Sequence, residues 1–123
     1  MSHTREEKIE AFGRFIDILD ILREKCPWDH KQTNESLRPN TIEETYELCD
    51  ALIRKDNEAT KKELGDVLLH IAFYAKIGEE NGSFDIADVC NALCEKLIAT
   101  LMYSVQPMSM DRTRLSKIGR NSN

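Results

Sequence analysis

Apolar residues recur with helical spacing through most of this chain, and this periodicity constrains its fold more than any other feature. In the first such segment, Ile9, Phe12, Ile16 and Leu19 are three or four residues apart, the spacing of one face of an α-helix. No segment alternates as a strand would. The pattern predicts four helices, over residues 4–25, 41–54, 58–79 and about 86–98. We therefore expect an all-α protein, a four-helix bundle formed by residues 1–98.

The segments between these helices carry helix-breaking signals. Pro27 and Pro39 bracket a polar stretch that predicts a long loop with at most one short helical turn. Thr41 would then cap the second helix, with Glu44 three residues later in the capping-box position. From Ala99 onward the helical period fails and the composition becomes basic and rich in Ser and Met, so we expect residues 99–123 to form an irregular tail.

Composition excludes several classes of partner. The chain has 123 residues and a net charge of −5, which disfavours non-specific attraction to nucleic acid or to an anionic membrane. No apolar run approaches the roughly 20 residues that span a bilayer, and the N-terminal region is too charged for a secretory signal. The four cysteines form no C-x-x-C pair, so we expect reduced cysteines, with Cys90 and Cys94 buried, in a cytoplasmic protein.

Two pairs of acidic residues on successive helices are the strongest functional signal. Glu44 and Glu47 are three residues apart, as are Glu63 and Asp66, so each pair lies on one face of its helix. Such pairs usually mark a solvated face, but the second pair adjoins the most apolar segment of the chain. If the two helices pack antiparallel, the carboxylates converge and need a cation. Oxygen donors favour Mg²⁺, with Mn²⁺ as a substitute.

Histidine supports no competing metal site. No histidine lies three residues after a glutamate, as a di-iron centre would require, and a Cys/His cluster for zinc is missing from the sequence. His70, one turn after Asp66, is better interpreted as a hydrogen-bonded histidine near the core.

Four motifs in order resemble one known family. The segments "CPWDHKQTNESLRP", "EETYE", "ELGDVLLH" and "FDIADV…EKLI" are similar to the MazG family of all-α nucleoside triphosphate pyrophosphohydrolases, over about Phe12 to Ile98. The resemblance implies a helical, usually dimeric enzyme that hydrolyses NTPs or dNTPs between the α- and β-phosphates. It also implies that Glu44, Glu47, Glu63 and Asp66 are the metal ligands. Glu43 would be a further ligand or would orient the attacking water.

The remaining site residues follow from chemistry and from the motifs. A carboxylate not committed to metal, Glu43 or Glu47, could accept a proton from the attacking water. Trp28 could stack on a base or could instead seal one end of the core. The other candidates for substrate binding are Lys31 and Gln32 for base or sugar, and Arg38 and Lys96 for the phosphates.

The C-terminal tail departs from the family pattern. After its K-L-I motif the family continues with R-H-P-x-V-F and, further on, N-W-E, whereas Ile98 is followed here by A-T-L-M. Permitted codons for residues 102–120, translated in another frame, can yield a sequence that begins Val-Phe-Gly and ends Asn-Trp-Glu. We therefore hypothesise a frameshift near Ala99, which would leave metal binding intact and weaken or abolish turnover. The alternative function is a non-catalytic nucleotide- or protein-binding module that keeps the metal cage.

Overall fold

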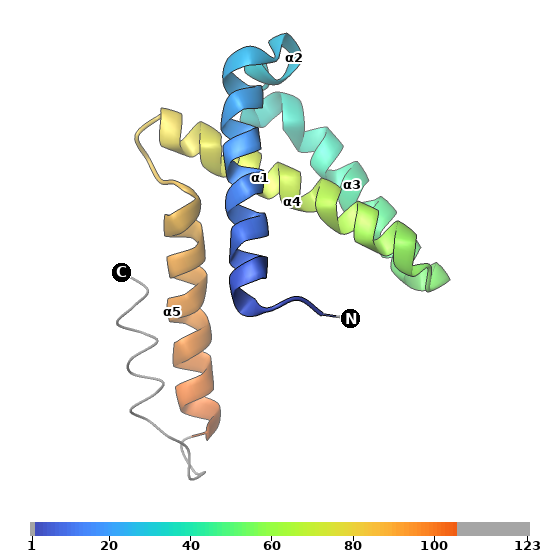
Figure 1. Ribbon diagram of the computed structural model, residues 1–123, viewed down its shortest axis with the longest axis vertical. Coiled ribbons are helices and arrows are strands. Elements are labelled where there is room, and N and C mark those ends of the chain that lie inside the picture. Colours follow the sequence, from blue (N-terminus) through green and yellow to red (C-terminus); the bar gives the residue numbers. More distant parts are fainter. Residues whose placement is uncertain (1, 106–123) are drawn as a thin grey trace.

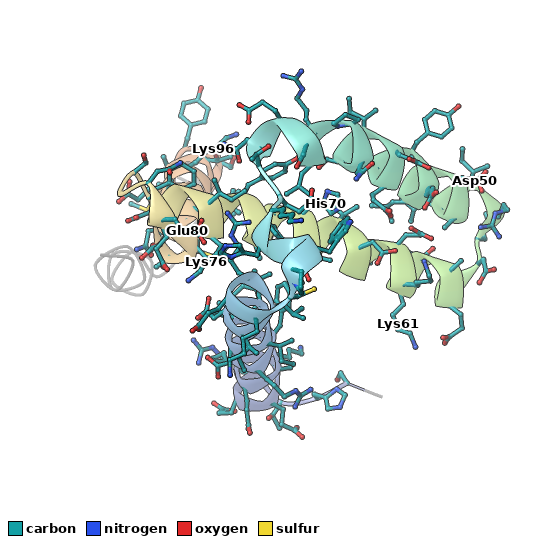
Figure 2. All side chains as sticks on the ribbon, turned by 90° about the horizontal axis from the view of Figure 1, so that it is seen from above. Asp50, Lys61, His70, Lys76, Glu80 and Lys96 are labelled. Carbon is teal, nitrogen blue, oxygen red and sulfur yellow. The ribbon has the colours of Figure 1, made fainter. Side chains whose placement is uncertain are left out.

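The computed structural model describes residues 2–105, which form five α-helices and no strand (Figure 1). The helices are α1 (Arg5–Lys25), α2 (Pro27–His30), α3 (Asn34–Arg54), α4 (Asn57–Glu80) and α5 (Ile86–Val105). α3 and α4 lie side by side as an antiparallel pair, and α1 crosses α4 (Figures 1 and 2). The all-α prediction is confirmed for this part of the chain. None of these helices is long and apolar enough to cross a membrane.

α1 and α4 follow the sequence prediction to within a residue or two. Thr4 accepts a hydrogen bond from the Glu7 amide and donates its own amide to the Glu7 carboxylate, which completes a capping box. Asp56 caps α4, and Lys55 before it takes a left-handed conformation that reverses the chain. This two-residue connection sets α3 and α4 antiparallel.

The predicted start of α3 at Thr41 was wrong, because the helix begins at Asn34. Thr33 and Ser36 form a reciprocal capping box, and Leu37 in the first turns is buried, so local capping and packing both favour the earlier start. Pro39 is then inside the helix, where it removes one amide donor near the N-terminal end. The predicted loop shrinks to a short segment that contains α2, the single helical turn expected there.

The irregular tail predicted from Ala99 was also wrong for residues 99–105, which continue α5 without a break. Ala, Leu and Met are good helix formers, and the first helix-breaking residue after Ile98 is Pro107. The rest of the predicted tail, residues 106–123, lies outside the described part of the chain.

The core lies where α1, α3 and α4 meet. Its buried side chains are Leu19 from α1, Leu37 from α3, and Ala72, Phe73 and Ile77 from α4. Two ion pairs connect α1 to α4 around this core. Lys76 Nζ lies 3.1 Å from Asp20 Oδ1, and Arg23 bonds to Glu80 near the end of α4.

Much apolar surface stays exposed in a single chain. α5 contacts only α4 among the described helices, and none of its residues from 86 to 104 is buried. Cys90 and Cys94 are accordingly exposed rather than buried, as is Cys49, and the described chain has no disulfide. α4 is also only partly covered, since Leu64 is 53% exposed and Ile71 is 46% exposed.

Candidate metal centre and substrate-binding residues

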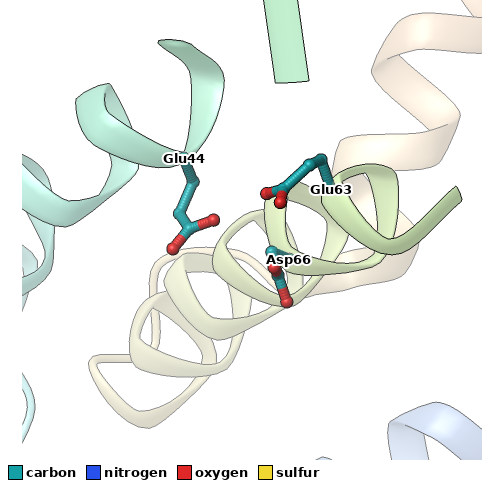
Figure 3. Close-up of side chains that lie close together, drawn as sticks. All are labelled: Glu44, Glu63 and Asp66. Carbon is teal, nitrogen blue, oxygen red and sulfur yellow. The ribbon is translucent and has the colours of Figure 1, made fainter. Parts of the chain in front are cut away.

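Three carboxylates from two helices converge in the groove between α3 and α4. Glu44 of α3 faces Glu63 and Asp66 of α4 (Figure 3). One oxygen of each carboxylate lies within 4.8 Å of the others. Glu63 and Asp66 are three residues apart on one helix face, and the antiparallel packing of α3 and α4 brings Glu44 opposite them. The convergence expected from the sequence is therefore present for three of the four predicted ligands.

The surroundings of these carboxylates leave their charge poorly compensated. Glu44 Oε2 and Glu63 Oε2 are both buried and have no hydrogen-bond partner. Burial raises the pKa of the Glu44 carboxyl, and the charges of Asp66, Glu47 and Glu63 raise it further. Partial compensation comes from Lys62, whose Nζ lies 3.3 Å from Glu63 Oε1 and 3.1 Å from Asp66 Oδ2.

These carboxylates fit a hard divalent cation. A buried carboxylate oxygen without a partner is costly, and a cation supplies the missing interaction. Mg²⁺ and Mn²⁺ prefer carboxylate and water oxygens, and the three converging residues offer only oxygen donors. Nitrogen and sulfur donors, which zinc would favour, are missing from the cluster.

Glu47 and Glu43 lie outside this group of three. At 100° per residue, Glu47 is turned about 60° from Glu44 around α3, whereas Leu48 and Ala51 stay closer to the groove. Glu47 and Glu43 are both exposed, and Glu47 is near enough for its charge to act on the pKa of Glu44. Their predicted roles as metal ligand and proton acceptor stay predictions.

A hydrogen-bonded cluster lies one helical turn from the carboxylates. The Thr41 hydroxyl donates to the Leu37 carbonyl oxygen at 3.1 Å, lies 2.6 Å from His70 Nδ1 and also contacts the Tyr74 hydroxyl. Burial lowers the pKa of His70, with Asp66 opposing the shift, so burial favours the neutral imidazole. His70 lies between α3 and α4 (Figure 2), which confirms the prediction of a hydrogen-bonded histidine near the core.

The candidate substrate-binding residues are spread over three helices. Trp28 on α2 is 61% exposed, so it does not seal the core of this chain. Gln32 donates from Nε2 to the Trp28 carbonyl oxygen at 3.2 Å and accepts from Ser36 Oγ at 2.8 Å. Lys31 is exposed just after α2. The two candidates for phosphate binding are also exposed, Arg38 on α3 and Lys96 on α5. Their substrate roles stay predictions.

Sequence analysis did not single out Arg23, whose guanidinium connects α1, α2 and α4. It bonds to the Glu80 carboxylate and to the carbonyl oxygens of Asp29, His30 and Gln32. One sequence signal could have found it. Arg23 lies four residues after Leu19, so it continues the buried face of α1 with a charged group.

The antiparallel helix pair with its carboxylate cluster defines an all-α protein with a candidate divalent-cation site. Comparison with known proteins gives the family. Residues 32–100 match the MazG nucleotide pyrophosphohydrolase domain, which is more than half of the chain. The chain therefore belongs to the MazG family, as its motifs suggested.

Individual relatives agree with this assignment. The nucleoside triphosphate pyrophosphohydrolase/pyrophosphatase MazG of Thermotoga maritima is 51% identical over 89 residues, or 71% of this chain and 35% of that protein. The nucleoside triphosphate pyrophosphohydrolase of Escherichia coli K12 is 44% identical over 92 residues, or 72% and 35%. The uncharacterized protein YabN of Bacillus subtilis is 44% identical over 98 residues, or 76% and 20%. The chain spans about a third or less of the length of these relatives.

Proposed function

We propose that this chain hydrolyses nucleoside triphosphates between the α- and β-phosphates, with Mg²⁺ as the cofactor, to give a nucleoside monophosphate and pyrophosphate. The observation that carries this proposal is the convergence of Glu44, Glu63 and Asp66, with two buried carboxylate oxygens that lack partners. The pyrophosphohydrolases that it resembles support the choice of substrate. Deoxyribonucleotides and ribonucleotides are both compatible with this site.

The chain's own residues divide into three roles in this proposal. Glu44, Glu63 and Asp66 hold Mg²⁺, with Glu47 as a further ligand at the edge of the groove. When bound, Mg²⁺ neutralises charge on the phosphate oxygens and so lets a nucleophile approach. Glu43 or Glu47 accepts the proton of the attacking water, because each is exposed within one turn of Glu44 along α3 and free of ion pairs in the described chain.

The substrate is held by residues outside the cluster. Trp28, Lys31 and Gln32 on and after α2 contact the nucleoside, since an exposed indole offers a stacking surface and the two polar side chains offer hydrogen bonds. Arg38 and Lys96 contact the phosphates through charge-assisted hydrogen bonds.

A second copy of the chain is the proposed partner for the exposed apolar faces. Leu93 and Leu97 on α5 are 52% and 54% exposed, and Ile42 and Tyr46 on α3 are 68% and 78% exposed. Exposed apolar side chains on two helices are typical of an interface. We expect a dimer in light scattering after gel filtration, and Leu97→Glu should shift it to monomer. A wild-type monomer at micromolar concentration would contradict the dimer.

A panel of NTPs and dNTPs with Mg²⁺ tests the activity through release of pyrophosphate. Asp66→Asn should abolish release while the circular dichroism spectrum stays unchanged. Asp50→Asn is the matched control, because Asp50 is an exposed acid near the far end of α3 (Figure 2) and pairs with Arg54. Because the tail after residue 98 departs from the family, the panel is run with this chain and with a chain that carries a family-like tail.

The alternative proposal, a non-catalytic nucleotide- or protein-binding module, makes a different prediction. It predicts that nucleotide binds both to this chain and to the chain with the family-like tail, and that neither releases pyrophosphate. That result would refute the proposed hydrolytic activity.

A further inference from the structure

Arg23, near the C-terminal end of α1, forms a fork with one carboxylate of α4. Its Nε donates to Glu80 Oε2 and its Nη2 donates to Glu80 Oε1, both at 2.8 Å. The Arg23 side chain is only 13% exposed, and its guanidinium carbon lies 5.4 Å from the centre of the Phe73 ring. Two parallel hydrogen bonds and an aromatic contact fix the guanidinium in one orientation.

The third nitrogen of this guanidinium holds the segment that carries the candidate nucleoside-binding residues. Arg23 Nη1 donates to the carbonyl oxygens of Asp29 at 2.8 Å, His30 at 3.2 Å and Gln32 at 2.9 Å. Carbonyl groups at the end of a helix have no partner within the helix and attract a cation. In return, His30 Nδ1 lies 3.1 Å from the Arg23 carbonyl oxygen.

These hydrogen bonds matter because α2 is too short and too exposed to be ordered by its own helical hydrogen bonds and packing. A helix of four residues is far below the length at which a helix is stable alone. Hydrophobic packing also contributes little, because α2 has no buried residue and Trp28 is 61% exposed. Hydrogen bonds therefore hold this segment in place, and those from Arg23 connect its carbonyl groups directly to α1 and, through Glu80, to α4.

We infer that Arg23 is a positioning residue for nucleoside recognition, an inference that rests on the proposed function. Arg23 does not touch the nucleotide. It holds α2 so that Trp28, Lys31 and Gln32 are ordered before the nucleoside arrives, which removes an ordering cost from binding. Lysine cannot replace it, because an ammonium group lacks the planar fork that bonds to a carboxylate and to carbonyl groups at once.

The test compares two ligands in isothermal titration calorimetry with Mg²⁺. One is an α,β-methylene NTP (below, the NTP), which cannot be cleaved between its α- and β-phosphates, and the other is inorganic tripolyphosphate, which has the phosphates but no nucleoside. Arg23→Lys should weaken NTP binding about tenfold and leave tripolyphosphate affinity within about twofold. Differences in affinity among the four bases should shrink as well. Arg54→Lys is the matched control, because Arg54 also pairs with carboxylates but far from α2, so both affinities should match the wild type.

Two outcomes would overturn the inference. Wild-type NTP affinity in Arg23→Lys would show that the anchorage is irrelevant to the nucleoside. Equal losses for NTP and tripolyphosphate would show a general structural role. If Arg23→Lys fails to fold, Glu80→Gln loosens the fork more mildly and must show the same selective loss for NTP. Failure of the proposed function is distinguishable, because it is measured on the wild-type protein, which would then release no pyrophosphate in the NTP panel. Failure of this inference is instead measured as the difference in affinity between Arg23→Lys and the wild type.

Discussion

Replacing Glu44 by glutamine should stabilise the metal-free protein and abolish its response to metal. Glutamine has nearly the shape of glutamate, so packing in the groove is preserved while one of three converging negative charges is removed. The wild-type carboxylates lie within 4.8 Å of one another, and a pair at that separation repels by about 1 kcal/mol in water and about 3.5 kcal/mol at an effective dielectric constant of 20. Glu44 takes part in two such pairs.

The net gain is smaller than the sum of these repulsions. Lys62 already lies near Glu63 and Asp66, and the raised pKa of Glu44 shows that protonation offers partial relief. We expect a gain of about 1–2 kcal/mol, which corresponds to a rise in Tm of roughly 4–8 °C for a domain of this size. In contrast, Mg²⁺ at one hundred times its Kd should stabilise the wild-type protein by about 2.7 kcal/mol.

Thermal unfolding in EDTA and in Mg²⁺ measures both effects. The order of stability should reverse: Glu44→Gln is more stable in EDTA, and the wild type is more stable in Mg²⁺. Glu43→Gln is the matched control, because Glu43 is the exposed neighbour on the same helix and the change in net charge is identical. Its Tm should stay near that of the wild type in EDTA. A Tm of Glu44→Gln below that of the wild type in EDTA would refute repulsion among the carboxylates. A wild-type rise in Tm with Mg²⁺ in this variant would refute Glu44 as a metal ligand.

Three further predictions test other parts of the molecule. Gly13→Ala should raise Tm, because a Cβ there meets open space and the change gains a helix propensity of about 1 kcal/mol. Gly78→Ala should gain less, because a Cβ there would lie 2.8 Å from ring atoms of Phe84, and the ring, which is 45% exposed, must move aside. Hydrogen bonds from Arg23 lower the pKa of Glu80. The stability from this pair is therefore present above the usual pKa of 4.5 and is lost as pH falls through the lowered pKa. In chemical denaturation at several pH values, Glu80→Gln should reduce this loss of stability at acid pH. Sequencing the encoding DNA tests the hypothesised frameshift, which requires another frame that spells the family tail.

The helices were predictable from the sequence where apolar period and capping agreed. α1 and α4 combine a regular stripe with capping by Thr4 and Asp56, and the predicted bounds agree with the structure to within one residue. The start of α3 was missed because Pro39 normally marks a boundary, whereas Thr33 caps the helix well before it. The continuation of α5 was missed because loss of apolar period does not end a helix that local propensity still favours.

The sequence predicted the part of the site that depends on spacing within one helix, but not the part that depends on how two helices pack. Spacing alone placed Glu63 and Asp66 on one face, but the orientation of α3 decides that Glu44 enters the groove while Glu47 stays at its edge. Arg23 gave a weaker signal, since its contacts are with backbone carbonyl groups that sequence patterns do not reveal.

The carboxylate cluster and the anchorage of α2 differ in how far their charges are compensated, and this contrast separates their parts in the proposed binding of a nucleoside triphosphate. Arg23 and Glu80 form a satisfied pair, so this part of the fold is fixed before any ligand arrives. Glu44 and Glu63 are left unsatisfied, so the groove gains most when a cation enters. Changing Arg23 should therefore weaken nucleoside recognition alone, whereas changing Glu44 should remove the metal response while stabilising the metal-free fold.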